Sequence, residues 1–412
     1  MRYISTRGDI ASRNFKDIII SGIAEDGGLY MPEFIPQIDA KTLKSWKKLS
    51  YIELATEIIA LFAGDLDKND IKNCCQRAYS TFDKDILKLN KLENTLYLLE
   101  LFHGPTLSFK DYALQFLGQI VDLILSERQI KKQIIIATSG DTGPAAIYGF
   151  KDCKLVNLKV YYPKNGVSKF QEEQMLSVKQ DSVKVVELDC NFDECQKLVK
   201  QEFANCRNDD LMTVNSINIG RIVAQTVYYC WTYLQFDEQS VNFYIPTGNF
   251  GNIFAGFLAK QMVANINLNI CVNENDTLYR FYKTGVYQPQ KVISTLSNAI
   301  DIANPSNFER ILWYLSSDKN DVVKYMENLK NNGFYKVSDE FLSKFREIFD
   351  VYSVNQNDML QTQKSCLEKY NTKICPHTAI ALGGFYARVR GGLVENDSEV
   401  NIAISTASWR KF

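Results

Sequence analysis

The stretch VNFYIPTGNFGNIFAGFLAKQ, residues 241–261, decides the fold class of this 412-residue chain. Residues 241–245 form a short run rich in β-forming side chains, and residues 253–261 carry apolar side chains at helical spacing. A loop rich in glycine and asparagine joins the two. Because a strand that passes through a loop directly into a helix is the building unit of a parallel sheet covered by helices, the stretch predicts an α/β fold.

The same alternation of short β-rich runs and longer helical patterns begins near residue 95 and extends to the end of the chain. It predicts further strands at residues 95–102, 133–137, 159–162, 183–188, 268–272 and 400–405. In an open α/β sheet, the loops that follow the strands are where ligands bind. Residues 51–62 and the region 306–370 show helical patterns instead.

The overall composition argues for a small ligand. The 47 basic and 48 acidic side chains nearly cancel, which removes the electrostatic reason to expect nucleic acid or an anionic membrane as a partner. The ten cysteines show no C-x-x-C spacing and are expected to be reduced, and two histidines are too few for a multi-histidine metal centre. Without a signal peptide or a membrane-length apolar run, a cytoplasmic enzyme is expected.

The loop in the opening stretch is a candidate phosphate site. Gly248, Asn249, Phe250, Gly251 and Asn252 follow the strand and precede the helix. Glycine and asparagine tolerate backbone conformations that turn several N–H groups toward one point, and the helix start adds its positive end. An ordinary strand-to-helix turn explains the same residues equally well. If a phosphate binds here, valine at Gly248 or Gly251 is expected to reduce ligand affinity more than stability.

Lys110 is the candidate nucleophilic amine. It follows the predicted strand 95–102 and precedes the helical pattern of residues 112–125. The helix dipole and partial burial both lower the pKa of a lysine at such a position, which favours the neutral amine that Schiff-base chemistry requires. From position alone, a solvated surface lysine is the stronger alternative.

Two further strand ends carry candidate binding residues. Residues 138–142, Thr-Ser-Gly-Asp-Thr, offer hydroxyl and N–H groups to a carboxylate or phosphate, with Pro144 expected to be the first helical residue. Helix capping by Asp141 or Thr142 is compatible with that interpretation. Thr406 follows the predicted strand 400–405 and could aim a hydroxyl at a ring nitrogen, although a plain terminal strand is the default.

Together, these segments resemble the threonine synthase family, which belongs to the fold type II, tryptophan-synthase-β-like, pyridoxal-phosphate enzymes. The segments that carry the resemblance are residues 3–8, 25–30, 102–111, 138–145, 215–221, 248–252, 301–310 and 376–379. They cover nearly the whole chain in the family's order. The resemblance implies an α/β fold with two parallel-sheet lobes, a cofactor cleft and an amino-terminal helical lobe. The implied domains are residues 1–90, a large cofactor-binding domain of 91–130 and 215–412 with a helical insertion near 306–370, and a small α/β domain of 131–214.

The resemblance also implies the roles of individual residues, with pyridoxal 5'-phosphate as cofactor and no metal. Lys110 would be the Schiff-base lysine and proton shuttle. The implied cofactor-binding residues are Gly248, Asn249, Phe250, Gly251, Asn252 and Thr406. The implied substrate-binding residues are Thr138, Ser139, Gly140, Asp141, Thr142, Asn215 and Arg221.

The implied activity is that of a carbon–oxygen lyase which converts O-phospho-L-homoserine and water into L-threonine and phosphate, as a monomer or homodimer. The chain departs from the family's pattern at Cys375, where an aspartate is usual, and at residues 408–410, Ser-Trp-Arg, where His-Pro-Ala is usual. These departures leave two alternatives open: a threonine-synthase-like phospholyase that releases 2-oxobutyrate, and a non-catalytic protein that binds the cofactor or an amino acid.

Overall fold

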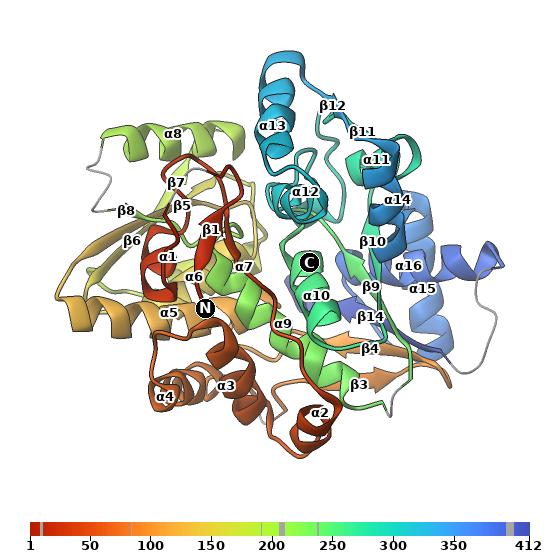
Figure 1. Cartoon of the computed structure of the whole chain (residues 1–412), viewed down its shortest axis with the longest axis horizontal. Coiled ribbons are helices and arrows are strands. Elements are labelled where there is room, and N and C mark those ends of the chain that lie inside the picture. Colours follow the sequence, from red (N-terminus) through yellow and green to blue (C-terminus); the bar gives the residue numbers. More distant parts are fainter. Residues whose placement is uncertain (9–10, 84, 191, 206–210, 237–238, 393–398) are drawn as a thin grey trace.

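A six-stranded and a four-stranded sheet organise the described part of the chain, and two further sheets have two strands each. Figure 1 shows their arrangement. This computed structural model describes residues 1–8, 11–83, 85–190, 192–205, 211–236, 239–392 and 399–412. The strands are β1 (Tyr3–Ser5), β2 (Tyr30–Pro32), β3 (Lys88–Lys91), β4 (Leu96–Glu100), β5 (Lys132–Ala137), β6 (Val156–Pro163), β7 (Val183–Leu188), β8 (Leu211–Met212), β9 (Val241–Pro246), β10 (Ile266–Val272), β11 (Val286–Tyr287), β12 (Tyr335–Lys336), β13 (Phe349–Ser353) and β14 (Val400–Ser405).

The helices are α1 (Phe15–Ser21), α2 (Ala40–Trp46), α3 (Tyr51–Phe62), α4 (Lys68–Tyr79), α5 (Lys110–Arg128), α6 (Thr142–Phe150), α7 (Lys169–Leu176), α8 (Phe192–Asn205), α9 (Ile219–Tyr233), α10 (Gly251–Met262), α11 (Thr277–Thr284), α12 (Phe308–Leu315), α13 (Asn320–Asn332), α14 (Asp339–Ile348), α15 (Gln356–Tyr370) and α16 (Pro376–Arg390). Short 3-10 helices η2 (Asn298–Ile300) and η3 (Trp409–Lys411) complete the described elements. No helix of these described residues is both long and apolar enough to cross a membrane.

The smaller sheet has the order β7-β6-β5-β8, and its strands all run parallel. The larger sheet has the order β13-β10-β9-β14-β4-β3, with only the β3–β4 pair antiparallel. The α/β class and the seven predicted strands are confirmed, with ends shifted by at most a few residues. The division of the chain into domains at residues 90, 130 and 214 stays a prediction.

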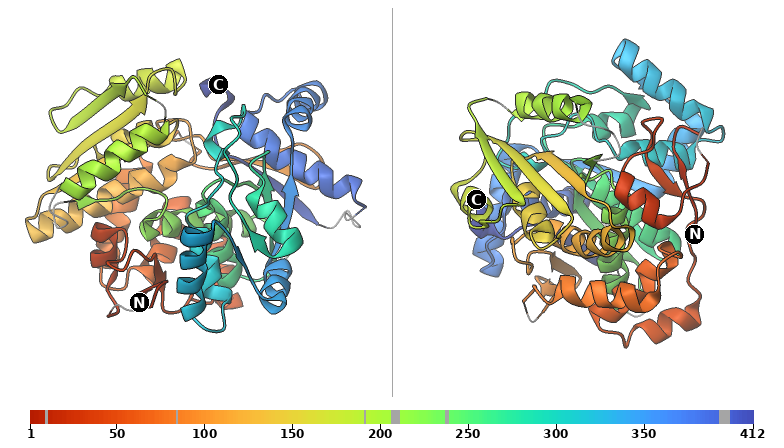
Figure 2. Two further views of the ribbon diagram at one scale, coloured as in Figure 1. Left: turned by 90° about the horizontal axis from the view of Figure 1, so that it is seen from above. Right: turned by 90° about the vertical axis from the view of Figure 1, so that its left-hand side faces the viewer.

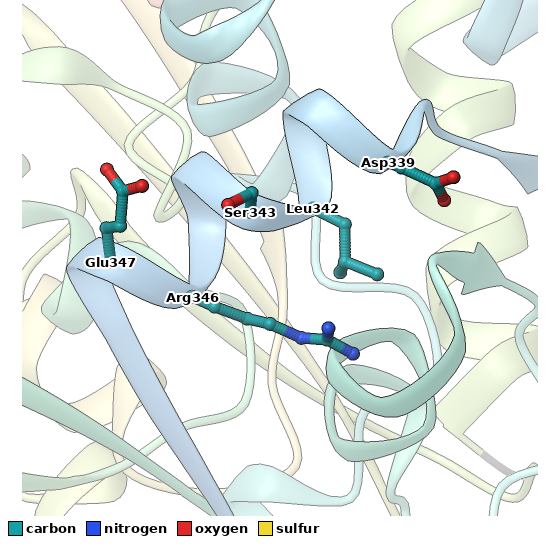
Figure 3. A pocket seen from close by; sticks show the side chains of 5 residues that line it. All are labelled: Asp339, Leu342, Ser343, Arg346 and Glu347. Carbon is teal, nitrogen blue, oxygen red and sulfur yellow. The ribbon is translucent and has the colours of Figure 1, made fainter.

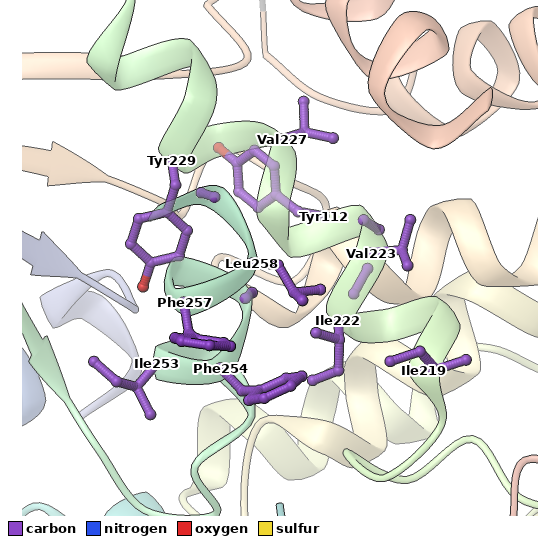
Figure 4. Packing of buried hydrophobic residues seen from close by; sticks show 14 of the residues in the cluster. Tyr112, Ile219, Ile222, Val223, Val227, Tyr229, Ile253, Phe254, Phe257 and Leu258 are labelled. Carbon is purple, nitrogen blue, oxygen red and sulfur yellow. The ribbon is translucent and has the colours of Figure 1, made fainter. Parts of the chain in front are cut away.

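The two faces of the larger sheet bury different side chains because successive residues of a strand point to opposite faces. Tyr244 packs with residues of α16 on one face, whereas Phe243 and Ile245 pack with α9 and α10 on the other. Helices α9 and α10 contact each other there, and Phe254 and Phe257 are fully buried. Figure 4 shows the packing of side chains from both helices. Burial of each such large apolar side chain contributes about 1.5–3 kcal/mol, so this core holds the loop before α10 firmly.

Two details of local structure differ from the sequence patterns. The region 306–370 is mainly helical, as predicted, but β12 and β13 (Phe349–Ser353) also lie within it, and β13 pairs with β10 as a parallel edge strand that buries Phe349 and Val351. Its short length and mixed composition hide it between two helical patterns. Pro144 is not the first helical residue, since α6 begins at Thr142. Proline is still tolerated there, because N–H groups in the first turn of a helix have no intrahelical partner.

The carboxyl terminus returns to the junction between the two sheets. Strand β14 lies between β4 and β9, and the residues that follow it run back along the loop that precedes α5. Figure 2 shows the chain end between the lobe of the smaller sheet and the helices of the larger one. The last residues of the chain are therefore placed next to residues from both lobes.

Candidate active site

The loop before Lys110 is fixed by its own hydrogen bonds. The carboxylate of Asp111 accepts from the N–H of Thr106 at 2.8 Å and from its hydroxyl at 2.7 Å. Gly104 packs against this carboxylate, and a Cβ atom there would lie 2.6 Å from that of Asp111, so no larger residue fits. The N–H of Phe109 donates to the carbonyl of Thr406 at 2.7 Å, which ties the loop to the end of β14.

Lys110 is the first residue of α5, and its side chain is only 13% exposed. The alternative of a solvated surface lysine is therefore wrong. Burial lowers the pKa of Lys110 to about 8, although Asp141, whose Oδ2 lies 3.8 Å from the amine nitrogen Nζ, acts in the opposite direction. Roughly one-tenth of the molecules carry the neutral amine at pH 7 with such a pKa, far more than for an exposed lysine.

Asp141 is the counter-charge of the site. It is 4% exposed, and its Oδ1 accepts from Lys411 Nζ at 2.8 Å and from Gln171 Nε2 at 2.9 Å. Burial by itself raises the pKa of Asp141, but Lys411 and Lys110 outweigh burial and hold the pKa below its ordinary value, so the carboxylate is charged. Helix capping by Asp141 or Thr142 is wrong: Asp141 occupies the cap position of α6 without a side-chain capping bond, and Thr142 is already helical.

The rest of the loop after β5 is shaped by Thr138. Its hydroxyl oxygen accepts from the N–H groups of Gly140 at 3.2 Å and Gly143 at 3.0 Å. The Thr138 side chain is therefore used within its own loop. Ser139, Gly140 and Thr142 are only partly buried, so they are the members of this loop that remain open to a ligand.

The loop after β9 presents backbone N–H groups. Phe250 is buried and has a φ of 62°, a left-handed conformation that is uncommon for an aromatic residue and indicates local backbone strain. Helix α10 begins at Gly251, and the first N–H groups of a helix have no intrahelical partner. The side chain of Asn249 donates one hydrogen bond to Ser216 and accepts one from the N–H of Ser306, so its amide is held in place within the loop.

Asn252 adds a side-chain donor to this loop. Its carbonyl oxygen Oδ1 accepts from the hydroxyls of Tyr228 at 2.5 Å and Tyr229 at 2.8 Å. The buried nitrogen Nδ2 then has no partner among the described residues, so it is an unused donor beside the start of α10.

Arg221 is a buried cation that has no anionic partner among the described residues. It is 3% exposed, and the only hydrogen bond of its side chain to these residues runs to the carbonyl of Val214 at 3.1 Å, which leaves Nε without a partner. Burial lowers the pKa of Arg221 to about 10, so the guanidinium is still charged at neutral pH, and it contributes to the low pKa of Lys110. A buried charge of this kind is costly unless an anion joins it. Asn215, predicted beside it, is exposed.

Two positions near the terminus bear on the departures from the family's pattern. Cys375 is the cap of α16, where its sulfur accepts from the N–H of Thr378 at 3.4 Å, so the thiol performs the capping role of an aspartate. The hydroxyl of Ser408 caps η3. Thr406 is buried directly after β14. Cys375 and Ser408 therefore both act as helix caps in this structure.

Sequence reasoning missed Lys411, Gln171 and the loop-fixing role of Asp111. A lysine next to the end of a chain is expected in solvent, yet the Lys411 side chain is fully buried. Its partner Asp141 lies far away in the chain, and no local periodicity records that contact. Asp111 did leave a signal, because it closely follows Thr106 in a turn-rich loop before a helix.

A surface hollow on α14 lies apart from these groups. It is lined by Asp339, Leu342, Ser343, Arg346 and Glu347, as Figure 3 shows. The guanidinium of Arg346 already donates to the carbonyl oxygens of Tyr282 and Lys283. None of the candidate site residues lines this hollow. We therefore keep the cluster around Lys110 as the candidate site.

Comparison with known proteins gives family matches over nearly the whole chain. Residues 2–79 match the family described as "Threonine synthase N terminus", and residues 83–405 match the family "Pyridoxal-phosphate dependent enzyme". Threonine synthase of Pseudomonas aeruginosa is 39% identical over 391 residues, which cover 93% of this chain and 83% of the relative. "Threonine synthase-like 2" of Mus musculus is 35% identical over 427 residues, covering 100% of this chain and 88% of the relative.

A solved structure agrees. The crystal structure of pyridoxal-phosphate-bound threonine synthase from Brucella melitensis superimposes with a TM-score of 0.95 at 36% identity, covering 99% of this chain and 89% of the other. The two family matches together span nearly all of the chain, and the fold agrees over its whole length. The chain therefore belongs to the threonine synthase family of pyridoxal-phosphate-dependent enzymes.

Proposed function

We propose that the chain is a threonine synthase that converts O-phospho-L-homoserine and water into L-threonine and phosphate. The observation that carries this proposal is the buried guanidinium of Arg221, which has no carboxylate partner among the described residues and contributes to the electrostatic environment of Lys110. A substrate phosphate would supply the missing anion, because a guanidinium matches phosphate oxygens in charge and geometry. The partly buried Ser139 and Thr142 would bind the substrate's carboxylate.

The residues present fit the family's cofactor. A phosphate is accommodated by the N–H groups at the start of α10, by the unused Nδ2 of Asn252 and by the absence of a side chain at Gly251. Ser108 carries a buried hydroxyl that has no partner among the described residues. When bound, pyridoxal phosphate supplies an electron sink for the carbon atoms next to the substrate's amino group. Thr406 would offer its hydroxyl to the pyridine nitrogen.

Lys110 would hold the cofactor and, once released by the substrate's amino group, move protons at the substrate's Cα and Cβ atoms. Burial keeps a useful fraction of its amine neutral at pH 7, as a base requires. Asp141 lies close enough to form an ion pair with Lys110 when the amine is protonated. The site thus has a base, a counter-charge and an unpaired cation for the leaving phosphate.

The product distinguishes this function from the alternatives. In water enriched in ¹⁸O, the synthase should place the heavy atom at Cβ of threonine in step with phosphate release. A phospholyase would instead release 2-oxobutyrate with the same phosphate, and a non-catalytic binder would release neither. Because Cys375 and Ser408 keep their capping bonds, we expect threonine to be the main product. A predominance of 2-oxobutyrate would contradict the proposal.

Gly251→Ala should lower cofactor affinity by about 10-fold, because an added methyl group would overpack a filled phosphate cradle. The cofactor-free protein should melt near the parent, since the nearest atom to a Cβ at Gly251 is Nδ2 of Asn307 at 3.4 Å. Fluorescence titration with pyridoxal phosphate and thermal melting measure the two effects. Unchanged affinity would show that the phosphate binds elsewhere.

Gly248→Ala is the matched control. A Cβ at Gly248 would lie 3.0 Å from the Cα of Ile300 and 3.2 Å from the carbonyl oxygen of Ala299, so backbone has to shift even without a ligand. We expect a lower melting temperature for this variant. Because this glycine packs against the chain itself, we expect a larger side chain at Gly248 to cost stability as well as affinity.

The remaining features of the proposed enzyme come from its sequence. A balanced charge argues against nucleic acid as a partner, and the substrate is a small molecule. A cytoplasmic location and a monomeric or homodimeric state are part of this proposal.

A further inference from the structure

The charged centre of the site consists of one carboxylate between two ammonium groups. Asp141 Oδ1 accepts from Lys411 Nζ at 2.8 Å, and Asp141 Oδ2 lies 3.8 Å from Lys110 Nζ. Lys411 also donates to the carbonyl of Thr106 at 2.5 Å, in the loop that leads to Lys110. Its side chain is fully buried. Lys411 therefore joins the loop after β5 to the loop before α5 through the last turn of the chain.

We propose that Lys411 is a positioning residue, which holds Asp141 against the Lys110 loop and neutralises its charge so that Lys110 is free to act as a neutral amine. The shorter contact of the carboxylate is with Lys411, so Lys110 is its second partner. Without Lys411, the whole charge of Asp141 would act on Lys110 and stabilise its ammonium form. This inference rests on the proposed role of Lys110 as a base.

Other charged groups reach Lys110 from each neighbouring element. Asp111 on α5 favours the ammonium form, whereas Arg221 on α9 opposes it. His377 on α16 shows the influence of Asp141 and Lys110 in turn, and burial lowers the pKa of His377 to about 4, so it is neutral at pH 7. Among these groups, Lys411 and Asp141 have opposite effects on Lys110 while contacting each other. Removal of Lys411 should therefore raise the pKa of Lys110, and removal of Asp141 should lower it.

The test measures the titration of Lys110 directly in the full-length chain after removal of the cofactor. Competitive labelling with acetic anhydride across a pH series, followed by peptide mass spectrometry, gives the midpoint at which Lys110 becomes reactive. The parent should show a midpoint near its pKa of about 8. Lys411→Met should raise the midpoint by about one pH unit, and Asp141→Asn should lower it.

Three more variants serve as controls. Lys411→Gln keeps a hydrogen-bond donor without the charge and should also raise the midpoint, which preserves the test if Lys411→Met does not fold. Lys411→Arg keeps the charge and should stay near the parent. Lys260→Met removes a partly buried lysine that bonds to the carbonyl of Ile266, away from the site. The labelling midpoint of Lys110 should be unchanged in this variant.

The outcomes separate a positioning role from a structural one. Opposite shifts in the Lys411 and Asp141 variants support the proposal. If both raise the midpoint toward that of an exposed lysine, the site has merely opened, and the proposal is overturned. An unchanged midpoint in Lys411→Met and Lys411→Gln overturns it as well. Because labelling needs neither cofactor nor turnover, these results do not depend on whether the chain is a threonine synthase.

Discussion

Lys110→Ala should reduce turnover of O-phospho-L-homoserine by at least about 10⁴-fold, because one amine would serve as both the cofactor's attachment point and the proton-moving base. Among the described residues, His377 is a poor substitute, because burial lowers its pKa to about 4 and its Nε2 already accepts from the N–H of Ala299 at 3.1 Å. Phosphate release, followed continuously, measures the loss. Weak cofactor binding should persist through the loop that begins at Gly248.

Two further measurements make this result decisive. Borohydride treatment of the parent with its cofactor, followed by peptide mapping, should place the cofactor's mass on Lys110. Lys260→Ala should keep parental turnover, because Lys260 lies on α10 and bonds to the carbonyl of Ile266. A Lys110→Ala protein that turns over substrate and keeps its visible absorption band would refute the assignment of this lysine.

Arg221→Met should lower kcat/KM by about 100-fold or more, mainly through a higher KM, because the substrate phosphate loses a buried charged partner. The stability of the substrate-free protein should not fall with the activity. The guanidinium has no ion-pair partner among the described residues, and its single bond to the carbonyl of Val214 offsets only part of the cost of burying the charge in the substrate-free protein. An apolar side chain of similar length removes that cost, and the melting temperature should stay the same or rise.

Arg310→Met is the contrasting variant. Arg310 is also fully buried, but it donates to the carbonyl oxygens of Tyr30 and Ile217 and to the side chain of Asn307. Its loss leaves buried acceptors without donors, so the melting temperature should fall. Steady-state kinetics and thermal melting of the two variants, measured side by side, distinguish an arginine that binds a ligand from an arginine that stabilises the fold. A parental KM in Arg221→Met would place the substrate phosphate elsewhere.

Much of the fold was predictable because its signals are local. Strand β9, its loop and α10 lie in one continuous stretch, and the apolar periods of 2 and 3.6 are visible there without any tertiary contact. Strand β13 was missed because it is short and lies between α14 and α15, and because its one partner among the described strands is the distant β10. The start of α6 was misplaced because proline marks the first turn of a helix rather than a single position within it.

The candidate site divides in the same way. By itself, the sequence determined the α/β class, the candidate lysine and the loops that could hold anions, since each follows from residue types at the end of a strand. The tertiary structure alone decided which polar groups are already used and which are left for a ligand. Thr138 and Asn249 are largely consumed by their own surroundings, whereas Arg221 keeps an unpartnered, buried guanidinium nitrogen. The contact between Lys411 and Asp141 also exists only in three dimensions, because hydrogen bonds and ion pairs depend on distances between atoms that folding brings together from remote parts of the chain.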